Sequence, residues 1–223
     1  MEAIISAHNL SKSYGDLTVL NRVSLSIRRG EIVAIVGPSG AGKTTLLQIL
    51  GTLTSPDSRT DTSLTIQDTD ILKLDTKQLA QFRNKSLGFI FQFHELLEEF
   101  SGLENVMMPA LIQGRKRSEV KTRALELLTL LGLADRQNHK PNSLSGGEQQ
   151  RIAVARALMN KPAIIFADEP SGNLDSQNAE HLHQLFFKLR DELGQTFVIV
   201  THNKTLAEMA DRTIVLKDGE IIQ

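Results

Sequence analysis

Apolar and polar positions alternate in one part of the chain and give way to continuous apolar runs in others. The stretch 19–27, VLNRVSLSI, places an apolar residue at most second positions, which is typical of a half-buried antiparallel strand. Three later runs, 32–36, 163–167 and 197–200, are apolar throughout and rich in Val and Ile. Such runs indicate parallel strands that are covered on both faces. A fourth candidate strand, SLGFIFQ, ends at Gln92.

Leucine-rich stripes at helical spacing lie between these strands. They occupy 120–131 and 182–193, and such stripes are usually core contacts, so we assign them no chemistry. The segment 93–160 is helical in pattern and carries no strand signal, as expected of a subdomain inserted into a sheet. Asp218-Gly219 lies between two apolar runs and predicts a hairpin. Strands that alternate with helices predict an α/β fold with a mainly parallel sheet.

Composition narrows the possible partners. The chain has 223 residues, with 25 Lys plus Arg against 26 Asp plus Glu, so it lacks the basic excess of a nucleic-acid-binding protein. It has no cysteine, which excludes disulfides and thiolate metal sites. The first residues, MEAIISAHNLSK, lack signal-peptide features, and no apolar run reaches the ~18–20 residues that span a bilayer. We therefore expect a cytosolic protein that meets a membrane only through a partner.

A glycine-rich loop follows the apolar run 32–36 and precedes TLLQIL, which can begin a helix. The loop, GPSGAGKT, matches the phosphate-binding P-loop pattern, and its strand–loop–helix context is the one that this pattern requires. Lys43 is expected to contact the β- and γ-phosphates, and the Thr44 hydroxyl is expected to bind Mg²⁺. The predicted nucleotide-binding residues are Gly37, Pro38, Ser39, Gly40, Ala41, Gly42, Lys43, Thr44 and Thr45.

Two carboxylates end the apolar strand AIIFA. Asp168 occupies the place of an aspartate that holds Mg²⁺ in P-loop enzymes, and Glu169 follows it directly. Two adjacent carboxylates are costly to hold together unless a cation or a function compensates. We expect Asp168 to serve the metal and Glu169 to polarise the attacking water.

A second small-residue segment, LSGGEQ at 144–149, resembles the signature motif of ATP-binding cassette (ABC) ATPases. The other motifs of that family follow in order over essentially the whole chain. The resemblance implies that Tyr14 stacks on adenine, that Gln92 is the Q-loop glutamine at Mg²⁺, and that His202 holds the γ-phosphate. It also identifies SGNLD, ending at Asp175, as the D-loop.

The family resemblance explains why one chain has two phosphate cradles. It implies that Ser145, Gly146 and Gly147 bind the γ-phosphate of an ATP held by the P-loop of a second cassette, so the chain is expected to form a homodimer around ATP and Mg²⁺. It also implies one cassette over 1–223: a RecA-like core with an antiparallel β subdomain, about 1–92 and 161–223, and a helical signature subdomain, about 93–160.

Three classes of ABC ATPase remain open: a transporter subunit, a protein acting on DNA or ribosomes, and a regulatory ATPase that transmits force across a membrane. The near-neutral charge disfavours the second class. The segment FQFHELLEEFSGLENVMMPAL resembles a bacterial subfamily with lipoprotein-releasing, macrolide-exporting and cell-division members, and most of all the lipoprotein-releasing type. This resemblance implies permease partners and a peripheral position on the cytoplasmic face of the inner membrane.

Two short segments depart from the usual family pattern. SPDSRTDTS, at 55–63, replaces a shorter glycine turn after the P-loop helix and is expected to be a surface connection. The motif around His202 reads THN, where the family commonly has THD, so Asn203 carries no charge at this position.

Overall fold

The computed structural model describes residues 2–57 and 60–222. The chain divides into two compact units, which are described separately below. Unit 1 comprises Met1–Ala80 and Phe187–Gln223, and unit 2 comprises Gln81–Phe186.

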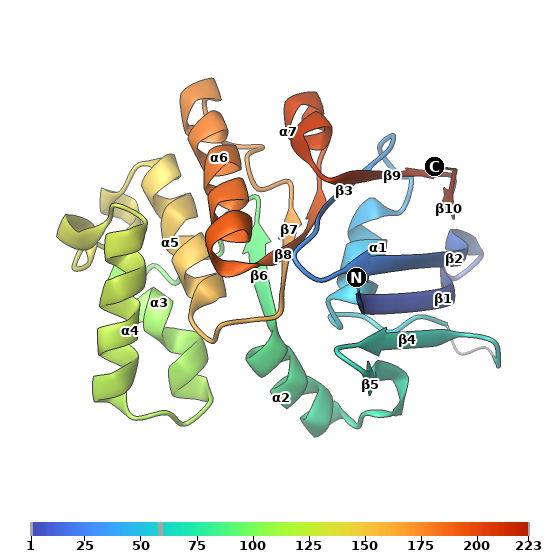
Figure 1. Ribbon diagram of the computed structural model, residues 1–223, viewed down its shortest axis with the longest axis horizontal. Coiled ribbons are helices and arrows are strands. Elements are labelled where there is room, and N and C mark those ends of the chain that lie inside the picture. The colour runs from blue at the N-terminus through green and yellow to red at the C-terminus, as the bar shows by residue number, and fades with distance from the viewer. Residues whose placement is uncertain (1, 58–59, 223) are drawn as a thin grey trace. The chain divides into compact units, whose positions relative to one another are not determined.

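Two groups of strands form unit 1 (Figure 1). The first is an antiparallel sheet in the order β2-β1-β4-β5, and the second follows the order β10-β9-β3-β8. In the second group β3 is parallel to both β8 and β9, whereas β10 is antiparallel to β9. The strands are β1 (Ala3–Tyr14), β2 (Leu17–Arg28), β3 (Ile32–Val36), β4 (Ser63–Ile66), β5 (Thr69–Asp70), β8 (Thr196–Val200), β9 (Arg212–Lys217) and β10 (Glu220–Ile221). The helices that lie wholly in this unit are α1 (Lys43–Leu50), the 3-10 turn η1 (Ile71–Lys73) and α7 (Lys204–Met209).

The parallel strands of unit 1 are buried as their apolar sequences predict. All five residues of β8 and the first four of β3 are buried, because a parallel strand inside a sheet is covered on both faces. Over Val23–Ile27 of strand β2 the two end residues are buried, Leu25 is half-buried, and the two serines between them are exposed; with its pairing to β1, this confirms the antiparallel prediction for this stretch.

A charged cluster fixes the edge where β3 and β9 begin. The Arg212 guanidinium donates to both carboxylate oxygens of Glu31, at 2.9 and 3.2 Å. Asp211 accepts from the Ile32 N–H at 2.8 Å and from Arg190 at 2.5 Å. These charge-assisted bonds tie the first residues of neighbouring strands together.

Unit 2 combines a two-stranded parallel pair with a group of helices (Figure 1). Its strands are β6 (Leu87–Phe91) and β7 (Ile164–Asp168). The segment predicted to be helical without strands contains α3 (Gly102–Ile112), α4 (Arg117–Leu130) and α5 (Gly146–Leu158), with the 3-10 turns η2 (Ala134–Arg136) and η3 (Pro141–Ser143). The helical interpretation of 93–160 is therefore confirmed.

Helix α5 packs closely on β6 because Gly88 has no side chain. A Cβ at Gly88 would lie 2.8 Å from the Ala157 carbonyl oxygen of α5. Helices α3 and α4 bury their apolar stripes, including Val106, Val120 and Leu127, which are not exposed at all. These contacts give the helical group a common apolar core.

Several elements were not anticipated from the sequence. Strand β1 is 12 residues long and pairs with both β2 and β4, although its apolar spacing is irregular where bulges shift its register. Helix α2 (Thr76–Ser86) has no buried residue, so it lacks the apolar stripe by which a helix is usually recognised. Helix α6 (Ser176–Leu193) extends six residues before the stripe that begins at Leu182.

One predicted turn is confirmed, and one predicted connection is described only in part. Strands β9 and β10 flank Asp218-Gly219 in an antiparallel pair, which confirms the hairpin. Within the predicted connection at 55–63, Ser58 and Arg59 lie outside the described residues.

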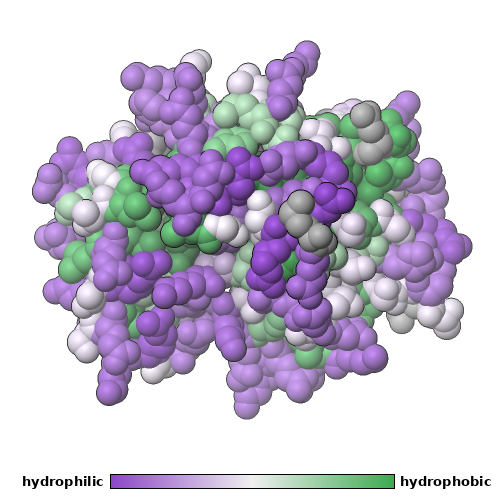
Figure 2. Space-filling view, in the orientation of Figure 1, coloured by the Kyte–Doolittle hydropathy of each residue, from purple (hydrophilic) through white to green (hydrophobic). Residues whose placement is uncertain are grey.

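The surface in Figure 2 is mainly hydrophilic, with hydrophobic side chains in patches between polar ones. Over residues 2–57 and 60–222, no helix combines the length and the apolar character that crossing a bilayer requires.

One buried asparagine organises the chain between β6 and α3. Asn105 is 1% exposed, and its carboxamide accepts from the Leu97 N–H at 2.8 Å. Its Nδ2 donates to the carbonyls of Leu97, Phe100 and Ser101, each at 3.1 Å. Ser101 and Glu104 form a capping box at the start of the same helix. The loop 97–101 is thus held by side chains of α3.

We expect Asn105→Ala to lower the free energy of unfolding by about 1–3 kcal/mol, because it leaves buried backbone groups of the loop without partners. Urea unfolding measures this loss, and hydrogen exchange at the Leu97 amide should become faster. The exposed Asn138 provides the control, because Asn138→Ala should change stability by less than ~0.5 kcal/mol. Equal stability of the two variants would contradict the anchoring role of Asn105.

Candidate functional site

The glycine-rich loop leaves β3 along a path that only glycine allows. Gly37 has φ 151°, and a Cβ there would lie 2.0 Å from the Leu216 carbonyl oxygen. Gly42 has φ 96°, and a Cβ there would lie 2.7 Å from the Val19 carbonyl oxygen. The backbone of the predicted P-loop is therefore wedged between neighbouring strands, which fixes the loop without the use of side chains.

The loop ends at the N-terminus of α1, which is open to an anion. Gly42 occupies the N-cap without a side-chain cap, and no acidic residue lies in the first turn. Free N–H groups and the helix dipole favour negative charge at such a position. The Lys43 ammonium folds back onto the loop and donates to the carbonyls of Gly37 and Pro38, both at 2.9 Å. A lysine held at the centre of the loop suits the binding of phosphate.

Tyr14 lies at the end of β1, in the hairpin that leads into the strand touching the P-loop. Its ring is 52% exposed, and Lys12 Nζ lies 5.4 Å from the ring centroid. The strand that follows, β2, contains Val19, whose carbonyl lies against Gly42. Tyr14 and the P-loop thus belong to the same unit, and the hairpin that follows Tyr14 leads into the strand that contacts the loop.

His202 follows β8, and the P-loop follows its parallel neighbour β3. The two strands pair in register with Ile35 opposite Val200, and the Thr201 N–H donates to the Ile35 carbonyl at 3.1 Å. Gly37 and His202 consequently line one hollow of about 430 Å³. Asn203, the departure from the usual motif, caps α7 by accepting from the Leu206 N–H at 3.0 Å. An uncharged asparagine is a good residue for that position.

In unit 2 the predicted metal and base residues lie at the carboxyl ends of two paired strands. Phe91 on β6 is opposite Asp168 on β7, so Gln92 and Glu169 are the first residues beyond the two strand ends. Glu169 has φ 46°, a left-handed conformation that is uncommon for a residue with a side chain. Functional groups commonly converge at this edge of a parallel sheet.

The proposed metal ligands are chemically suited to Mg²⁺. Thr44, Gln92 and Asp168 offer a hydroxyl, an amide oxygen and a carboxylate, and Mg²⁺ prefers such oxygen donors. Among the described residues there is no group of three or more His, Cys, Asp or Glu side chains that could enclose an ion. Mg²⁺ is usually bound in proteins through one or two carboxylates together with nucleotide phosphates.

The signature segment begins α5 with a capping box. Ser145 Oγ accepts from the Glu148 N–H at 3.3 Å, and Glu148 Oε2 accepts from the Ser145 N–H at 2.8 Å. The Arg136 guanidinium, together with the Ser145 N–H, lowers the pKa of the Glu148 carboxyl to about 2. Glu148 is therefore anionic at neutral pH and occupies the helix end that the family resemblance assigns to a γ-phosphate. The Ser145 hydroxyl also donates to Glu148, at 2.9 Å.

The D-loop contacts the signature segment through Asn178. Asp175 accepts from the Asn178 N–H and side chain at 2.8 and 2.7 Å, and these bonds lower the pKa of the Asp175 carboxyl. A Cβ at Gly147 would lie 2.4 Å from Asn178 Oδ1. Gly147 is thus required for packing within the chain, in addition to its predicted role at phosphate.

A buried histidine supports the same loop. His183 is 3% exposed, and its Nε2 lies 3.0 Å from Ser171 Oγ. Burial lowers the pKa of His183, so the imidazole is neutral at pH 7. Sequence reasoning assigned no role to His183 or Asn178, and neither belongs to a motif that would have identified it.

The predicted site residues therefore fall into two groups. Unit 1 contains Tyr14, residues 37–45 and His202, whereas unit 2 contains Gln92, residues 145–147, Asp168, Glu169 and Asp175. Within each unit, residues that are far apart in sequence lie close together.

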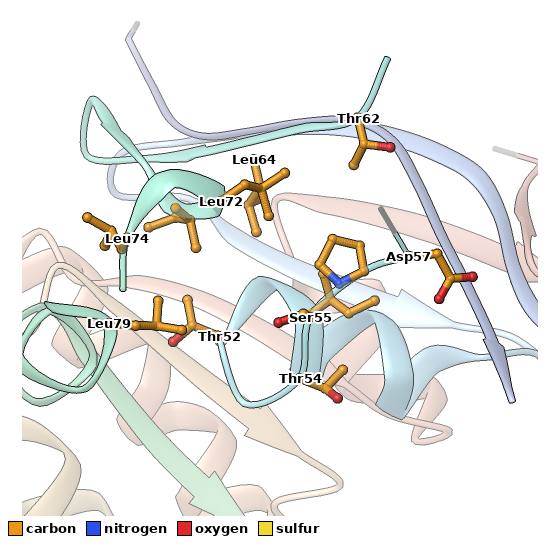
Figure 3. A pocket seen from close by; sticks show the side chains of 12 residues that line it. Thr52, Thr54, Ser55, Asp57, Thr62, Leu64, Leu72, Leu74 and Leu79 are labelled. Atoms are coloured by element: carbon orange, nitrogen blue, oxygen red, sulfur yellow. The ribbon is translucent and has the colours of Figure 1, made fainter. Parts of the chain in front are cut away.

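A second hollow in unit 1 has different chemistry. It has a volume of about 390 Å³ and lies beyond the C-terminal end of α1, at the other end of this helix from the P-loop. Figure 3 shows Thr52, Leu74 and Leu79 at one end of it and Asp57 and Thr62 at the other. Among the described residues that line it, none is Lys or Arg.

Comparison with known proteins identifies close full-length relatives. The family described as "ABC transporter" matches residues 20–172. The Lipoprotein-releasing system ATP-binding protein LolD of Bacteroides thetaiotaomicron is 59% identical over 218 residues, which cover 98% of this chain and 99% of the relative. The LolD protein of Porphyromonas gingivalis is 60% identical over 216 residues, which cover 97% of each chain.

Solved structures agree with the fold. A dimeric structure of MJ0796, a bacterial ABC transporter cassette, superposes with a TM-score of 0.88 at 43% identity, and the match covers 98% of this chain and 97% of that one. A dimeric post-hydrolysis state of MJ0796 bound to ADP and Pi gives the same TM-score at 41% identity, with the same coverage. The expected ABC-cassette architecture, with its parallel strands, antiparallel β sheet and helical segment, is confirmed. The family match spans more than half of the chain, and the relatives are similar to this chain over nearly their whole length. This chain therefore belongs to the ABC transporter ATP-binding family.

Proposed function

We propose that this chain is the ATP-hydrolysing subunit of a bacterial inner-membrane ABC system that releases lipoproteins from the membrane. The observation that carries the proposal is the sequence identity of 58–60% to three proteins named LolD, over 97–98% of this chain. The arrangement of the P-loop and the paired strand ends supports the enzymatic part of the proposal.

Each predicted site residue has a role in this proposal. The residues at 37–45 hold the phosphates of ATP, with Lys43 on the β- and γ-phosphates, and Tyr14 stacks on the adenine. Glu169 polarises the attacking water, and His202 holds the γ-phosphate. Thr44, Gln92 and Asp168 hold Mg²⁺, which when bound neutralises charge on the phosphates.

Hydrolysis in this proposal requires two chains. Ser145, Gly146 and Gly147 present the N-terminus of α5 to the ATP of a second copy, and Asp175 of the D-loop contributes beside them. Both MJ0796 structures are dimers, one of them with ADP and Pi bound, which supports this arrangement. In the structure the Ser145 hydroxyl donates a hydrogen bond to the Glu148 carboxylate, so a phosphate must compete with this carboxylate for that hydrogen bond.

The membrane partner is proposed to bind the segment that follows Gln92. Phe93 is 72% exposed, Leu97 44% and Phe100 37%, although all three are large apolar side chains. Arg156 of α5 donates to the carbonyls of His94 and Glu95, which keeps this segment in a defined conformation. A fixed apolar surface suits a helix of a permease, and the chain would then lie at the cytoplasmic face of the inner membrane. No nucleic-acid partner is expected.

Replacing the proposed base should separate binding from hydrolysis. We expect Glu169→Gln to reduce the rate of phosphate release from ATP by at least ~10²-fold, because a positioned general base is lost. ATP binding should persist, and the variant should accumulate as an ATP-dependent dimer in size-exclusion chromatography with light scattering.

The control for this experiment is Glu126→Gln, an exposed position on α4. It should hydrolyse ATP at the unmodified rate. A Glu169→Gln variant that stays monomeric at saturating Mg-ATP with the permease present would argue against the shared site.

Mixing two inactive variants tests whether the site is shared between chains. Lys43→Ala should weaken ATP binding, and Ser145→Arg should leave binding intact but block turnover, so that each variant alone is inactive. A dimer with one copy of each variant contains one site with both changes and one intact site. We therefore expect the mixture to regain ATP hydrolysis, measured as phosphate release.

Failure of the mixture to regain activity, although mixed dimers form, would mean that one site does not use residues from both chains. Mixing Lys43→Ala with Glu169→Gln gives the necessary control. Both of these residues belong to the same half of the site, so each site of their mixed dimer carries one change, and this mixture should stay inactive. A second comparison is a chain that carries Lys43→Ala and Ser145→Arg together, mixed with unmodified chain, because each site of that mixed dimer also carries one change.

The exposed apolar segment can be tested with a polar substitution. We expect Phe93→Ser to reduce recovery of the complex between this chain and its permease from detergent-solubilised membranes, while ATP affinity stays unchanged, because the lost contact lies outside the nucleotide-binding residues. Leu130→Ser, at a 43% exposed position on α4, is the matched control and should leave recovery intact. Equal recovery of the Phe93→Ser complex would exclude this surface as the permease contact.

A further inference from the structure

Gln92 is joined to the D-loop by two hydrogen bonds that run in opposite directions. Its side-chain Nε2 donates to Asn173 Oδ1 at 3.0 Å. Asn173 Nδ2 donates in return to the backbone carbonyl of Gln92 at 3.1 Å. Both residues belong to unit 2, and they are separated by 81 positions in the sequence.

This pair fixes the orientation of both amide groups. A backbone carbonyl can only accept a hydrogen bond, so Asn173 must turn its NH₂ group toward the Gln92 carbonyl. The oxygen of Asn173 then faces the Gln92 side chain, which must present its own NH₂ group. Gln92 Oε1 is left outside the pair, and an amide oxygen is the atom that Mg²⁺ binds.

The loop that carries Asn173 is itself held in place. Ser171 lies 3.0 Å from the buried His183, and the Gly172 N–H donates to the Glu169 carbonyl at 3.0 Å. A Cβ at Gly172 would lie 2.8 Å from Gln92 Nε2, so the glutamine amide rests directly on this glycine. The glycine against which the Gln92 amide packs is therefore itself hydrogen-bonded to the backbone of Glu169.

We propose that Asn173 is a positioning residue that orients the Gln92 amide so that its oxygen, and not its nitrogen, is offered to Mg²⁺. The inference rests on the proposed function, because it assumes that Gln92 binds the metal that accompanies ATP. Partners that orient a metal ligand commonly change metal affinity by about 10–100-fold when they are removed. Asn173 also links the segment after Gln92 to the loop after Glu169.

The test measures metal-dependent ATP binding, not turnover. All chains carry Glu169→Gln and Ser145→Arg, so that ATP is neither hydrolysed nor shared between two copies. The Kd for ATP is measured by isothermal titration calorimetry, once with Mg²⁺ and once with EDTA. The Kd in EDTA divided by the Kd in Mg²⁺ is the factor by which the metal tightens ATP binding. In Asn173→Ala we expect this ratio to fall by about 10-fold, with the Kd in EDTA unchanged.

A double-mutant cycle shows whether Asn173 acts through Gln92. In a Gln92→Ala background, Asn173→Ala should have no further effect on the ratio, because no amide remains to be oriented. Asn138→Ala, at an exposed asparagine elsewhere in unit 2, is the matched control and should leave the ratio intact. Thermal unfolding of each variant verifies that the fold is retained.

The outcomes separate the inference from the function on which it rests. A ratio that Asn173→Ala leaves unchanged, or that falls equally with and without Gln92, overturns the positioning role while the proposed function stands. If Mg²⁺ gives no gain in ATP affinity even with Asn173 and Gln92 intact, both the proposed function and this inference fail.

Discussion

The register of parallel strands is the constraint on which the site in each unit depends. Parallel strands carry their carboxyl ends to the same edge of a sheet, so the loops that follow them must be neighbours. Phe91 opposite Asp168 places Gln92 beside the acidic pair, and Ile35 opposite Val200 places the P-loop beside His202. A shift of one position would turn the buried apolar residues of these strands toward other neighbours, so burial itself protects the geometry of the site.

Glycine contacts hold the functional loops against this framework. Gly37 and Gly42 let the P-loop touch the carbonyls of Leu216 and Val19, and Gly147 lets the signature segment touch Asn178. In each case a Cβ would lie less than 3 Å from its neighbour. These glycines bring the loops close to their supports, and in the proposed function they also open backbone N–H groups to an anion.

Side chains that bind backbone carbonyls give the segment after Gln92 its form. His94 and Glu95 have φ of 61° and 49°, a costly conformation for residues with side chains, and Arg156 binds both of their carbonyls. Asn105 does the same for the loop that ends at Ser101. The exposed Phe93 and Phe100 are consequently displayed by a well-supported loop, which favours the proposed contact with a permease.

The strand–loop–helix of the P-loop, the buried parallel strands and the residue types of the proposed site can all be predicted from the sequence, because apolar runs and fixed motif spacing are local properties. The sequence also indicated the helical segment and the hairpin at Asp218-Gly219. Three contacts are visible only in the folded chain. Asn173 pairs with Gln92, His183 lies against Ser171, and Glu148 binds Ser145 at the N-terminus of α5. These contacts join residues through strand pairing and side-chain direction, and no local pattern of residues encodes either.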